Sequence, residues 1–290
     1  MKIKFGFWPR EYELEARDIQ IAPLPEFSDV IEAVKASSHV DGAWIYPPRN
    51  GAFVPYQIPP THVMNIAERT QGREFGELAI SILGLLEGML LIPEEWIRFY
   101  RAAIEPNTLS DLVCSKTEIV KLLETVHIFW EANSSLNIRR NLFGAIHWLL
   151  FSQSYEQEFE VFAWQYIVMD SCFKLHVDIN AIPRNQQPSH YLRPSFLANA
   201  YSIPEPSWAI VNGNECELSK LRNEFFHEGR YVGHPIGFAL STMNPNIKLQ
   251  LISFNTRLIL GILGVNCEYV RTPVDTRQMH GLGLIHYRSI

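Results

Sequence analysis

The spacing of apolar residues changes its period along the chain, and this change constrains the fold more than any other feature. Up to about residue 72, apolar and polar residues alternate in short runs such as Lys2–Phe5 and Glu13–Ala16, which is typical of half-buried strands. From Arg73 onward the apolar residues recur at the spacing of one face of a helix. The chain is therefore predicted to be mainly α-helical, with a small α+β module at its start.

The α+β module, residues 1–72, is predicted to combine these strands with one short helix at Phe27–Ser37. Its turns are marked by three dipeptides, Pro47-Pro48, Asn50-Gly51 and Pro59-Pro60. The pattern leaves the order of the strands open.

A middle segment, residues 73–135, is predicted to be helical. Its three expected helices are Glu74–Leu91, Pro93–Ile104 and Ser115–Asn133. Pro93 stands where the first turn of a helix accepts proline. Ser115 followed by Glu118 is a capping-box pattern at the start of the third helix.

The remainder, residues 136–290, is predicted to form a third, helical domain. Its four expected helices are Ile138–Ser152, Gln157–Val177, Glu215–Glu228 and Ile247–Leu263. The connection between the second and third of these helices, residues 179–213, contains five prolines. A connection of that length inside a compact domain is usually functional or partly disordered.

The charge balance and the first residues indicate the class of protein. Lys and Arg number 25 against 31 Asp and Glu, a net charge of −6, which argues against attachment to nucleic acid through overall charge but leaves room for a local basic pocket. The start of the chain lacks the apolar region of a secretory signal, so a cytoplasmic location is expected. The most apolar stretch, Leu78–Ile92, is shorter than the roughly 20 residues that span a bilayer and contains Glu87, so no membrane partner is expected.

Neither the cysteines nor the histidines form a metal-binding pattern. The cysteines are widely separated, without a CxxC pair, and are predicted to be buried free thiols: Cys114, Cys172, Cys216 and Cys267. His127 and Glu131, one helical turn apart, are interpreted as a surface pair. The histidines do not form HExxH or another metal-ligand pattern, so no metal is predicted. No phosphate-binding or dinucleotide-binding glycine motif is present, and no cofactor is predicted.

The helix predicted at Glu215–Glu228 carries an arginine on its apolar face. The residues that define its buried arc are Leu218, Leu221, Phe225 and Phe226. Arg222 falls inside this arc and needs an anionic partner, because an unpaired buried charge costs several kcal/mol. Asp170, at the edge of the apolar stripe of the preceding helix, is one candidate. Such a pair would either fix the register of two helices or give Asp170 a catalytic role.

Two polar residues of the same helix, Asn223 and His227, fall outside the buried arc. They are one helical turn apart, so the amide can orient the imidazole. Gly229 is predicted to end the helix just after them. Histidine is suited to acid–base chemistry at neutral pH, although a histidine in this position is often only an exposed residue at a helix end.

The segment LRNEFFHEG, Leu221–Gly229, contains an arginine, a polar residue and, five positions after the arginine, a histidine: Arg222, Asn223 and His227. It resembles the R-x4-H motif of the HEPN superfamily, the nucleotide-binding helical domains of higher eukaryotes and prokaryotes. The resemblance covers about residues 136–270 and implies an HEPN-like four-helix bundle, preceded by the α+β module and the helical middle segment.

Many HEPN domains are metal-independent endoribonucleases, some of them toxins or defence proteins, whose active sites form between two motifs across a dimer. The resemblance implies a homodimer that cleaves single-stranded RNA by attack of a 2′-hydroxyl, with Arg222 and His227 catalytic and Asn223 supporting. Asp170 is predicted to support the site from its position on the preceding helix. On an ideal helix Arg222 and His227 project 140° apart, so they are expected to meet through a second copy.

Other HEPN members lack nuclease activity and act as nucleotide-binding or protein-interaction modules, which is the alternative function. Glu224 and Glu228 would repel an RNA backbone, and Arg230 and His234 are expected to compensate by binding phosphate.

A second and looser match to the motif lies in the helix predicted at Ile138–Ser152. There Arg140 and Asn141 are followed by His147, with six residues between the arginine and the histidine. Because Asn141 lies on the same face as Trp148, this match is the weaker candidate for a catalytic motif.

Overall fold

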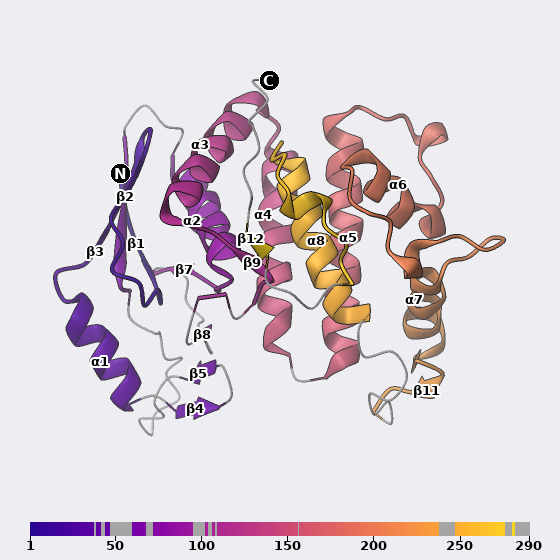
Figure 1. Ribbon diagram of the computed structural model, residues 1–290, viewed down its shortest axis with the longest axis horizontal. Helices are drawn as coiled ribbons and strands as arrows, with labels where there is room; N and C mark the ends of the chain where they lie inside the picture. The colour runs from indigo at the N-terminus through magenta and orange to yellow at the C-terminus, as the bar shows by residue number, and fades with distance from the viewer. Residues whose placement is uncertain are drawn as a thin grey trace. The chain divides into compact units, whose positions relative to one another are not determined.

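The computed structural model describes residues 1–37, 39–41, 44–46, 60–67, 72–94, 102–103, 106–107, 109–155, 157–237, 247–275 and 280–281. The chain forms two compact units, Met1–Trp130 and Glu131–Ile290 (Figure 1). It is mainly helical with a small antiparallel sheet, as the change of period predicts. Almost all of the predicted middle segment belongs to the first unit.

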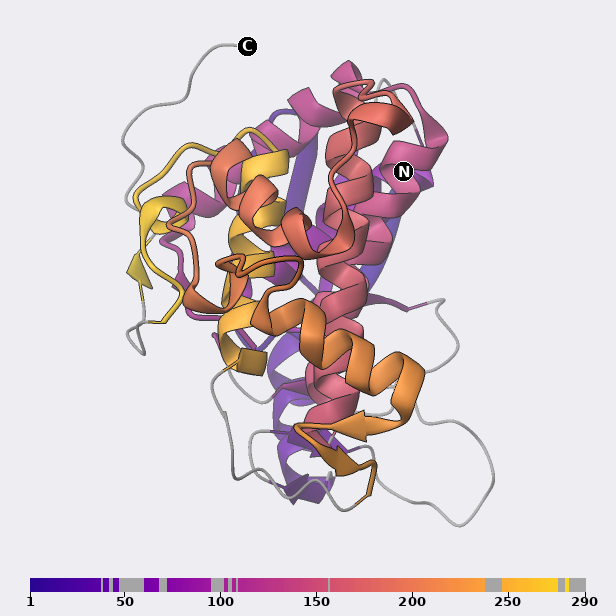
Figure 2. The same cartoon turned by 90° about the vertical axis from the view of Figure 1, so that its right-hand side faces the viewer.

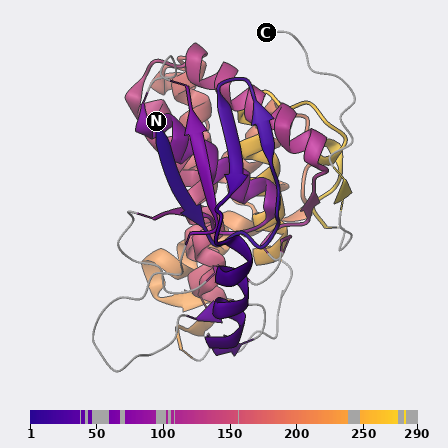
Figure 3. The same ribbon diagram turned by 90° about the vertical axis from the view of Figure 1, so that its left-hand side faces the viewer.

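The first unit contains a five-stranded antiparallel sheet (Figure 3). In spatial order its strands are β2 (Leu14–Ala16), β3 (Ile19–Pro23), β6 (His62–Ile66), β1 (Lys2–Gly6) and β7 (Ile92–Pro93). Ile3 pairs with Met64 across β1 and β6, and both side chains are buried in the core. The predicted strands at the start of the chain are confirmed as β1 and β2, and the predicted short helix is α1 (Phe27–Ser37).

Helix α2 (Arg73–Glu87) packs directly on this sheet. A Cβ atom on Gly76 would lie 2.4 Å from Cδ1 of Ile66 and 2.5 Å from Cδ1 of Ile3, so glycine permits the close approach. The helix ends at Gly88, whose φ of 56° is left-handed. The predicted continuation to Leu91 is therefore wrong, because Gly88 stops the helix before the apolar run ends.

The helix predicted at Pro93–Ile104 is wrong at both of its described ends. Pro93 belongs to β7 and pairs with Phe5 of β1 at the edge of the sheet, where a strand tolerates proline. Ala102–Ala103 forms β8, which pairs with β5 (Trp44–Tyr46), the partner of β4 (His39–Asp41). Residues 95–101 and 104 lie outside the described residues. Pairing with strands distant in sequence overrides the local helical period here.

Helix α3 (Lys116–Ala132) follows β9 (Leu112–Val113) and begins as predicted. The backbone N–H of Ser115 donates to Oε2 of Glu118 over 2.7 Å, and the N–H of Glu118 donates to Oγ of Ser115 over 3.4 Å. These two bonds are the predicted capping box.

The second unit contains the four helices predicted for the C-terminal domain. They are α4 (Leu136–Phe151), α5 (Glu158–Ile179), α7 (Glu217–Glu228) and α8 (Ile247–Ile262). Helix α5 packs against α4 and α8 (Figure 1) and also contacts α7. Buried polar groups join three of them: Nδ2 of Asn255 in α8 donates to Oε1 of Gln165 in α5 over 2.8 Å, and Nε2 of Gln165 donates to the Leu149 carbonyl of α4 over 3.1 Å.

The proline-rich connection, residues 179–213, is ordered and contains a helix that the sequence pattern missed. Helix α6 (Arg193–Ala200) begins with Arg193 and has Pro194 in its first turn. It lies on the same side of α5 as α7 does (Figure 2). Three 3₁₀ turns accompany it, η2 (Arg184–Gln186), η3 (His190–Leu192) and η4 (Ser207–Ala209). The prolines break the helical period that would have revealed α6.

The remaining short elements are η1 (Ser152–Ser154), β10 (Arg230–Tyr231), β11 (His234–Pro235), η5 (Tyr269–Arg271) and β12 (His280–Gly281). The hairpin of β10 and β11 directly follows α7. No helix within the described residues has the length and apolarity needed to cross a membrane.

Candidate functional site

Helix α7, which carries the HEPN-like motif, has defined ends. The N–H of Cys216 donates to Oγ of Ser219 over 2.9 Å at its start, and Gly229 ends it with a φ of 64°, as predicted. Leu218 and Leu221 are buried, as the predicted arc requires, but Phe226 is 43% exposed. The arc is therefore narrower than predicted, because the ring of Phe226 lies at the edge of the core, 6.2 Å from the Tyr166 ring.

The structure brings the three motif residues together within one chain. Nη1 of Arg222 donates to Oδ1 of Asn223 over 2.9 Å and lies 2.6 Å from Nε2 of His227. A guanidinium has no acceptor, so a hydrogen bond in this contact requires Nε2 to accept. The sequence favoured a meeting of Arg222 and His227 through a second copy, but they also meet within one chain, because the long arginine side chain reaches around the helix.

Asp170 pairs with an arginine other than the predicted one. Nη1 of Arg193, the first residue of α6, donates to Oδ1 of Asp170 over 2.7 Å. The Arg193 guanidinium also lies 4.4 Å from the centre of the Phe173 ring. The predicted Asp170–Arg222 pair is absent from the contacts of the described residues, since the unpredicted helix α6 supplies a closer cation. The only sequence signal for Arg193 is Pro194, which can start a helix.

Tyr166 lies one helical turn before Asp170 and faces the same charges. The residue is 4% exposed, and its hydroxyl has no hydrogen-bond partner within the described part of the chain. Burial, and then the Asp170 carboxylate, raise the pKa of Tyr166 to about 12, while Arg222 and Arg193 act in the opposite direction. The Tyr166 hydroxyl thus interacts electrostatically with both Arg222 and Arg193.

His190, in η3, interacts electrostatically with the same two arginines. Burial, followed by the positive charge of Arg193, lowers the pKa of this histidine; the Asp170 carboxylate acts in the opposite direction, and Arg222 lowers the pKa further. We call Tyr166, Asp170, His190, Arg193 and Arg222 the two-arginine cluster. It joins α5, the proline-rich connection and α7 beside the exposed side of His227.

The acidic residues that flank the motif are engaged locally. The N–H of Gly233 donates to Oε2 of Glu224 over 3.1 Å, which ties the following hairpin to α7. Glu228 forms an ion pair with Arg230, so Arg230 already has a carboxylate partner. His234 lies in β11 and is exposed. Arg230 is therefore a weaker phosphate ligand than the sequence suggested, since an RNA phosphate would compete with Glu228.

Two other histidines, His147 and His127, pack against aromatic rings. His147 of the looser motif stacks between Phe143 and Phe151, with ring centres 6.3 Å and 5.5 Å away, and burial lowers the pKa of His147. His127 is 7% exposed and packs against the edge of Phe75, so its interpretation as part of a surface pair is wrong. A helix face that packs on the core places His127 inside.

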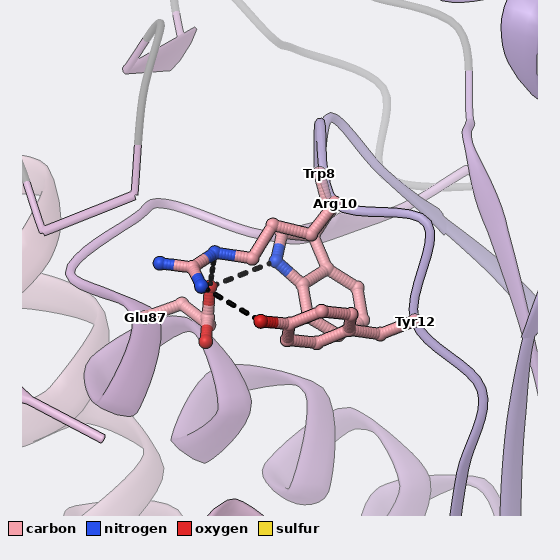
Figure 4. Close-up of polar contacts among 4 residues, drawn as sticks. All are labelled: Trp8, Arg10, Tyr12 and Glu87. Atoms are coloured by element: carbon pink, nitrogen blue, oxygen red, sulfur yellow. Dashed lines mark hydrogen bonds and ion pairs between the residues drawn. The ribbon is translucent and has the colours of Figure 1, made fainter. Parts of the chain in front are cut away.

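A buried carboxylate forms a separate polar cluster in the first unit (Figure 4). Oε2 of Glu87, which is 1% exposed at the end of α2, accepts a hydrogen bond from Trp8 Nε1 over 3.0 Å and forms an ion pair with Arg10 Nε over 2.8 Å. Nη1 of Arg10 also donates to the Tyr12 hydroxyl over 2.9 Å. Burial raises the pKa of Glu87. These contacts bind residues 8–12 to the end of α2. Sequence reasoning missed the cluster because Glu87 is far in the chain from Trp8 and Arg10.

His62 is completely buried beside this cluster. Its Nδ1 lies 3.0 Å from Oγ1 of Thr61, and its ring centre lies 4.6 Å from that of Trp8. Burial lowers the pKa of His62 to about 4, against a smaller opposite effect of a hydrogen bond with the Arg10 backbone, so the ring is neutral at physiological pH.

Within the described part of the chain, no three His, Cys, Asp or Glu side chains are grouped as metal ligands. The four cysteines are buried and free, as predicted. The chain matches no protein-family model, no curated protein and no solved structure. The case for a function therefore depends on the geometry of the sites.

Proposed function

We propose that the second unit is a metal-independent endoribonuclease of the HEPN type that cleaves single-stranded RNA at α7. The observation that carries this proposal is the contact of Arg222 with both Asn223 and His227 on one accessible helix face. A guanidinium beside an imidazole suits phosphodiester cleavage, because one stabilises the charge that the other creates by moving a proton.

The reaction requires one proton to leave and another to arrive. Nε2 of His227 takes the proton of a ribose 2′-hydroxyl, and the 2′-oxygen attacks the adjacent phosphorus. The bond from phosphorus to the 5′-oxygen breaks, which leaves a 2′,3′-cyclic phosphate and, after protonation, a 5′-hydroxyl. Arg222 stabilises the negative charge on the phosphate oxygens in the transition state.

RNA binding also prepares His227 for this role. In the structure Nη1 of Arg222 donates to the lone pair of Nε2 that a general base needs. A substrate phosphate competes for the guanidinium and releases that lone pair. His227 therefore becomes a base when RNA is bound.

A homodimer would complete the chemistry. One imidazole at each cleavage site serves as the base, and His227 of a second copy protonates the leaving 5′-oxygen. Single-stranded RNA is the proposed substrate, because unpaired nucleotides can adopt the in-line geometry and stack on an exposed ring such as Phe226. A nuclease of this kind would act in the cytoplasm as a toxin or defence protein.

The test is incubation of the purified full-length protein with a mixed single-stranded RNA pool in a metal chelator. We expect products that end in 2′,3′-cyclic phosphate, and His227→Ala and Arg222→Ala should each lower the rate at least about a hundredfold. The matched control is Arg140→Ala/His147→Ala, which alters the looser motif in α4 and should leave the rate unchanged. Undiminished cleavage by His227→Ala would overturn the proposal.

The contact between Arg222 and His227 also favours a second function, a non-catalytic HEPN module that binds a nucleotide or a protein. If Nε2 of His227 stays occupied by Arg222, the histidine serves only to orient the guanidinium. This function predicts binding of RNA that depends on Arg222, no cyclic phosphate products, and nearly normal binding by His227→Ala.

A further inference from the structure

Three hydrogen-bond donors in the two-arginine cluster lack partners in the described structure. They are the hydroxyl of Tyr166, Nε of Arg193 and Nε of Arg222, and all three atoms are shielded from solvent. They come from α5, α6 and α7 respectively. Buried donors are rarely left unpaired, and three in one cluster indicate a ligand that accepts hydrogen bonds.

The charges of the cluster indicate an anion. Tyr166 and His190 each interact electrostatically with two arginines and with one carboxylate, that of Asp170, which already accepts from Nη1 of Arg193. His190 adds no compensating negative charge, and its lowered pKa reflects the nearby cations after burial. A partly buried site with excess positive charge is stabilised by an anionic ligand.

Phosphate fits these donors better than a single carboxylate does. Guanidinium groups bind phosphate oxygens through paired N–H donors, and two arginines on separate helices can bind different oxygens of one phosphate. The Arg222 guanidinium also lies 5.7 Å from the centre of the exposed Phe226 ring, on which a base next to that phosphate could stack.

We infer that Arg193, Arg222 and the Tyr166 hydroxyl form a binding site for one phosphate group of a nucleotide or RNA strand, with the adjacent base stacked on Phe226. The identification of RNA as the source of the phosphate rests on the proposed function. Asp170 holds Arg193 in position and competes with the phosphate for its Nη1 donor. The proline-rich connection thus supplies a second cation to the site through α6.

The experiment measures binding of a short single-stranded RNA with 2′-O-methyl groups, which the proposed reaction cannot cleave, by fluorescence anisotropy with the full-length protein. Arg193→Gln should weaken binding about tenfold or more and lower the slope of log affinity against log salt by about 0.7. The matched control Arg184→Gln removes an exposed cation from the same connection, in η2, and should change affinity less than about twofold. Tyr166→Phe, which deletes one oxygen atom, should weaken binding about fivefold.

A second comparison separates phosphate binding from a structural role of the ion pair. Arg193→Gln and Asp170→Asn break the same hydrogen-bonded pair, but only Arg193→Gln removes the cation. We expect Asp170→Asn to keep or strengthen RNA binding, and Arg193→Lys to bind with intermediate affinity because it keeps the charge without the fork of donors. If Asp170→Asn and Arg193→Gln weaken binding equally, or if Arg193→Gln binds like Arg184→Gln, the inference is wrong.

The outcomes distinguish this site from the proposed nuclease. Binding of the methylated RNA that depends on Arg193, together with no cleavage of ordinary RNA, would retain the phosphate site and reject the nuclease. Cleavage that depends on His227 but is unchanged in Arg193→Gln would retain the nuclease and reject the phosphate site. Inorganic phosphate is the second probe: if it binds in an Arg193-dependent way and the RNA does not bind, the site takes free phosphate and the RNA assignment is wrong.

Discussion

The buried histidine of the first unit makes the stability of that unit depend on pH. His62 is completely buried, and its pKa falls from 6.5 to about 4 in the folded state. Between these two values the unfolded chain binds the proton and the folded chain does not, so stability is lost as the pH falls through this window. Integration of proton binding gives a loss of ~2 kcal/mol between pH 7.5 and pH 5.0, and ~3 kcal/mol below pH 4.

The variant that tests this reasoning is His62→Asn. Asparagine can retain the hydrogen bond to Oγ1 of Thr61 but has no proton to gain. Burial raises the pKa of Glu87, so this carboxyl contributes the opposite pH dependence, gaining stability as the pH falls. Glu87 is present in both proteins, and its contribution cancels in their difference.

The assay is urea unfolding at pH 7.5 and pH 5.0, followed by pulsed hydrogen exchange of a peptide from β1, which reports on the first unit alone. Wild-type protein should lose ~2 kcal/mol more than His62→Asn between the two pH values. Equal losses would refute the reasoning, because they would mean that His62 takes up a proton as readily when folded as when unfolded.

Three further predictions concern the second unit and are checked by chemical denaturation. Gly261→Ala should destabilise the second unit by about 1–3 kcal/mol, because a Cβ atom there would lie 2.8 Å from Cδ1 of the Tyr201 ring. Gly144→Ala should stabilise it by about 0.5–1 kcal/mol, because a Cβ atom there would have no heavy atom within 4 Å. Equal effects of the two substitutions would contradict the packing. Arg257→Met should lower the free energy of unfolding by about 2–4 kcal/mol, because the buried Arg257 side chain donates to the Tyr269 hydroxyl over 3.0 Å. It should also speed hydrogen exchange in η5, and unchanged exchange there would contradict this prediction. Ser219→Ala should cost about 1 kcal/mol by removing the cap of α7, with the loss of protection confined to the first turn.

Local patterns were sufficient for the longer helices of the second unit and for the start of α3, whose formation depends on neighbouring residues, but not for α6 or for residues 93–104. The apolar period located α4, α5, α7 and α8, and the pair Ser115 and Glu118 located the start of α3. The sheet was less predictable, because β6 joins β1 and β3 through pairings that no local pattern encodes. Pro93 shows how strand pairing overrides a local pattern. Its position suits the first turn of a helix, but it pairs with Phe5 at the edge of the sheet.

The candidate site was predictable only in part, for a related physical reason. Arg222, Asn223 and His227 lie within six positions on one helix, so their spacing could be read directly. The partner of Asp170 could not, because Arg193 arrives on a helix that prolines conceal in the sequence pattern. A helical wheel also gives the direction of a side chain at Cβ, whereas the contact of Arg222 with His227 depends on the length of the arginine beyond that atom.

The net charge of −6 is a weaker objection to RNA binding than the sequence suggested, because the acids near α7 are already engaged. Glu224 accepts from the backbone of the hairpin, and Glu228 pairs with Arg230. Asp170 compensates Arg193, which leaves the charge of Arg222 beside His227 without a carboxylate partner in the described structure. Electrostatic attraction of a phosphate depends on such a local excess within about one Debye length, roughly 8–10 Å, more than on charges elsewhere on the chain. Affinity for RNA should therefore follow substitutions at the two arginines and change little when distant surface acids are neutralised.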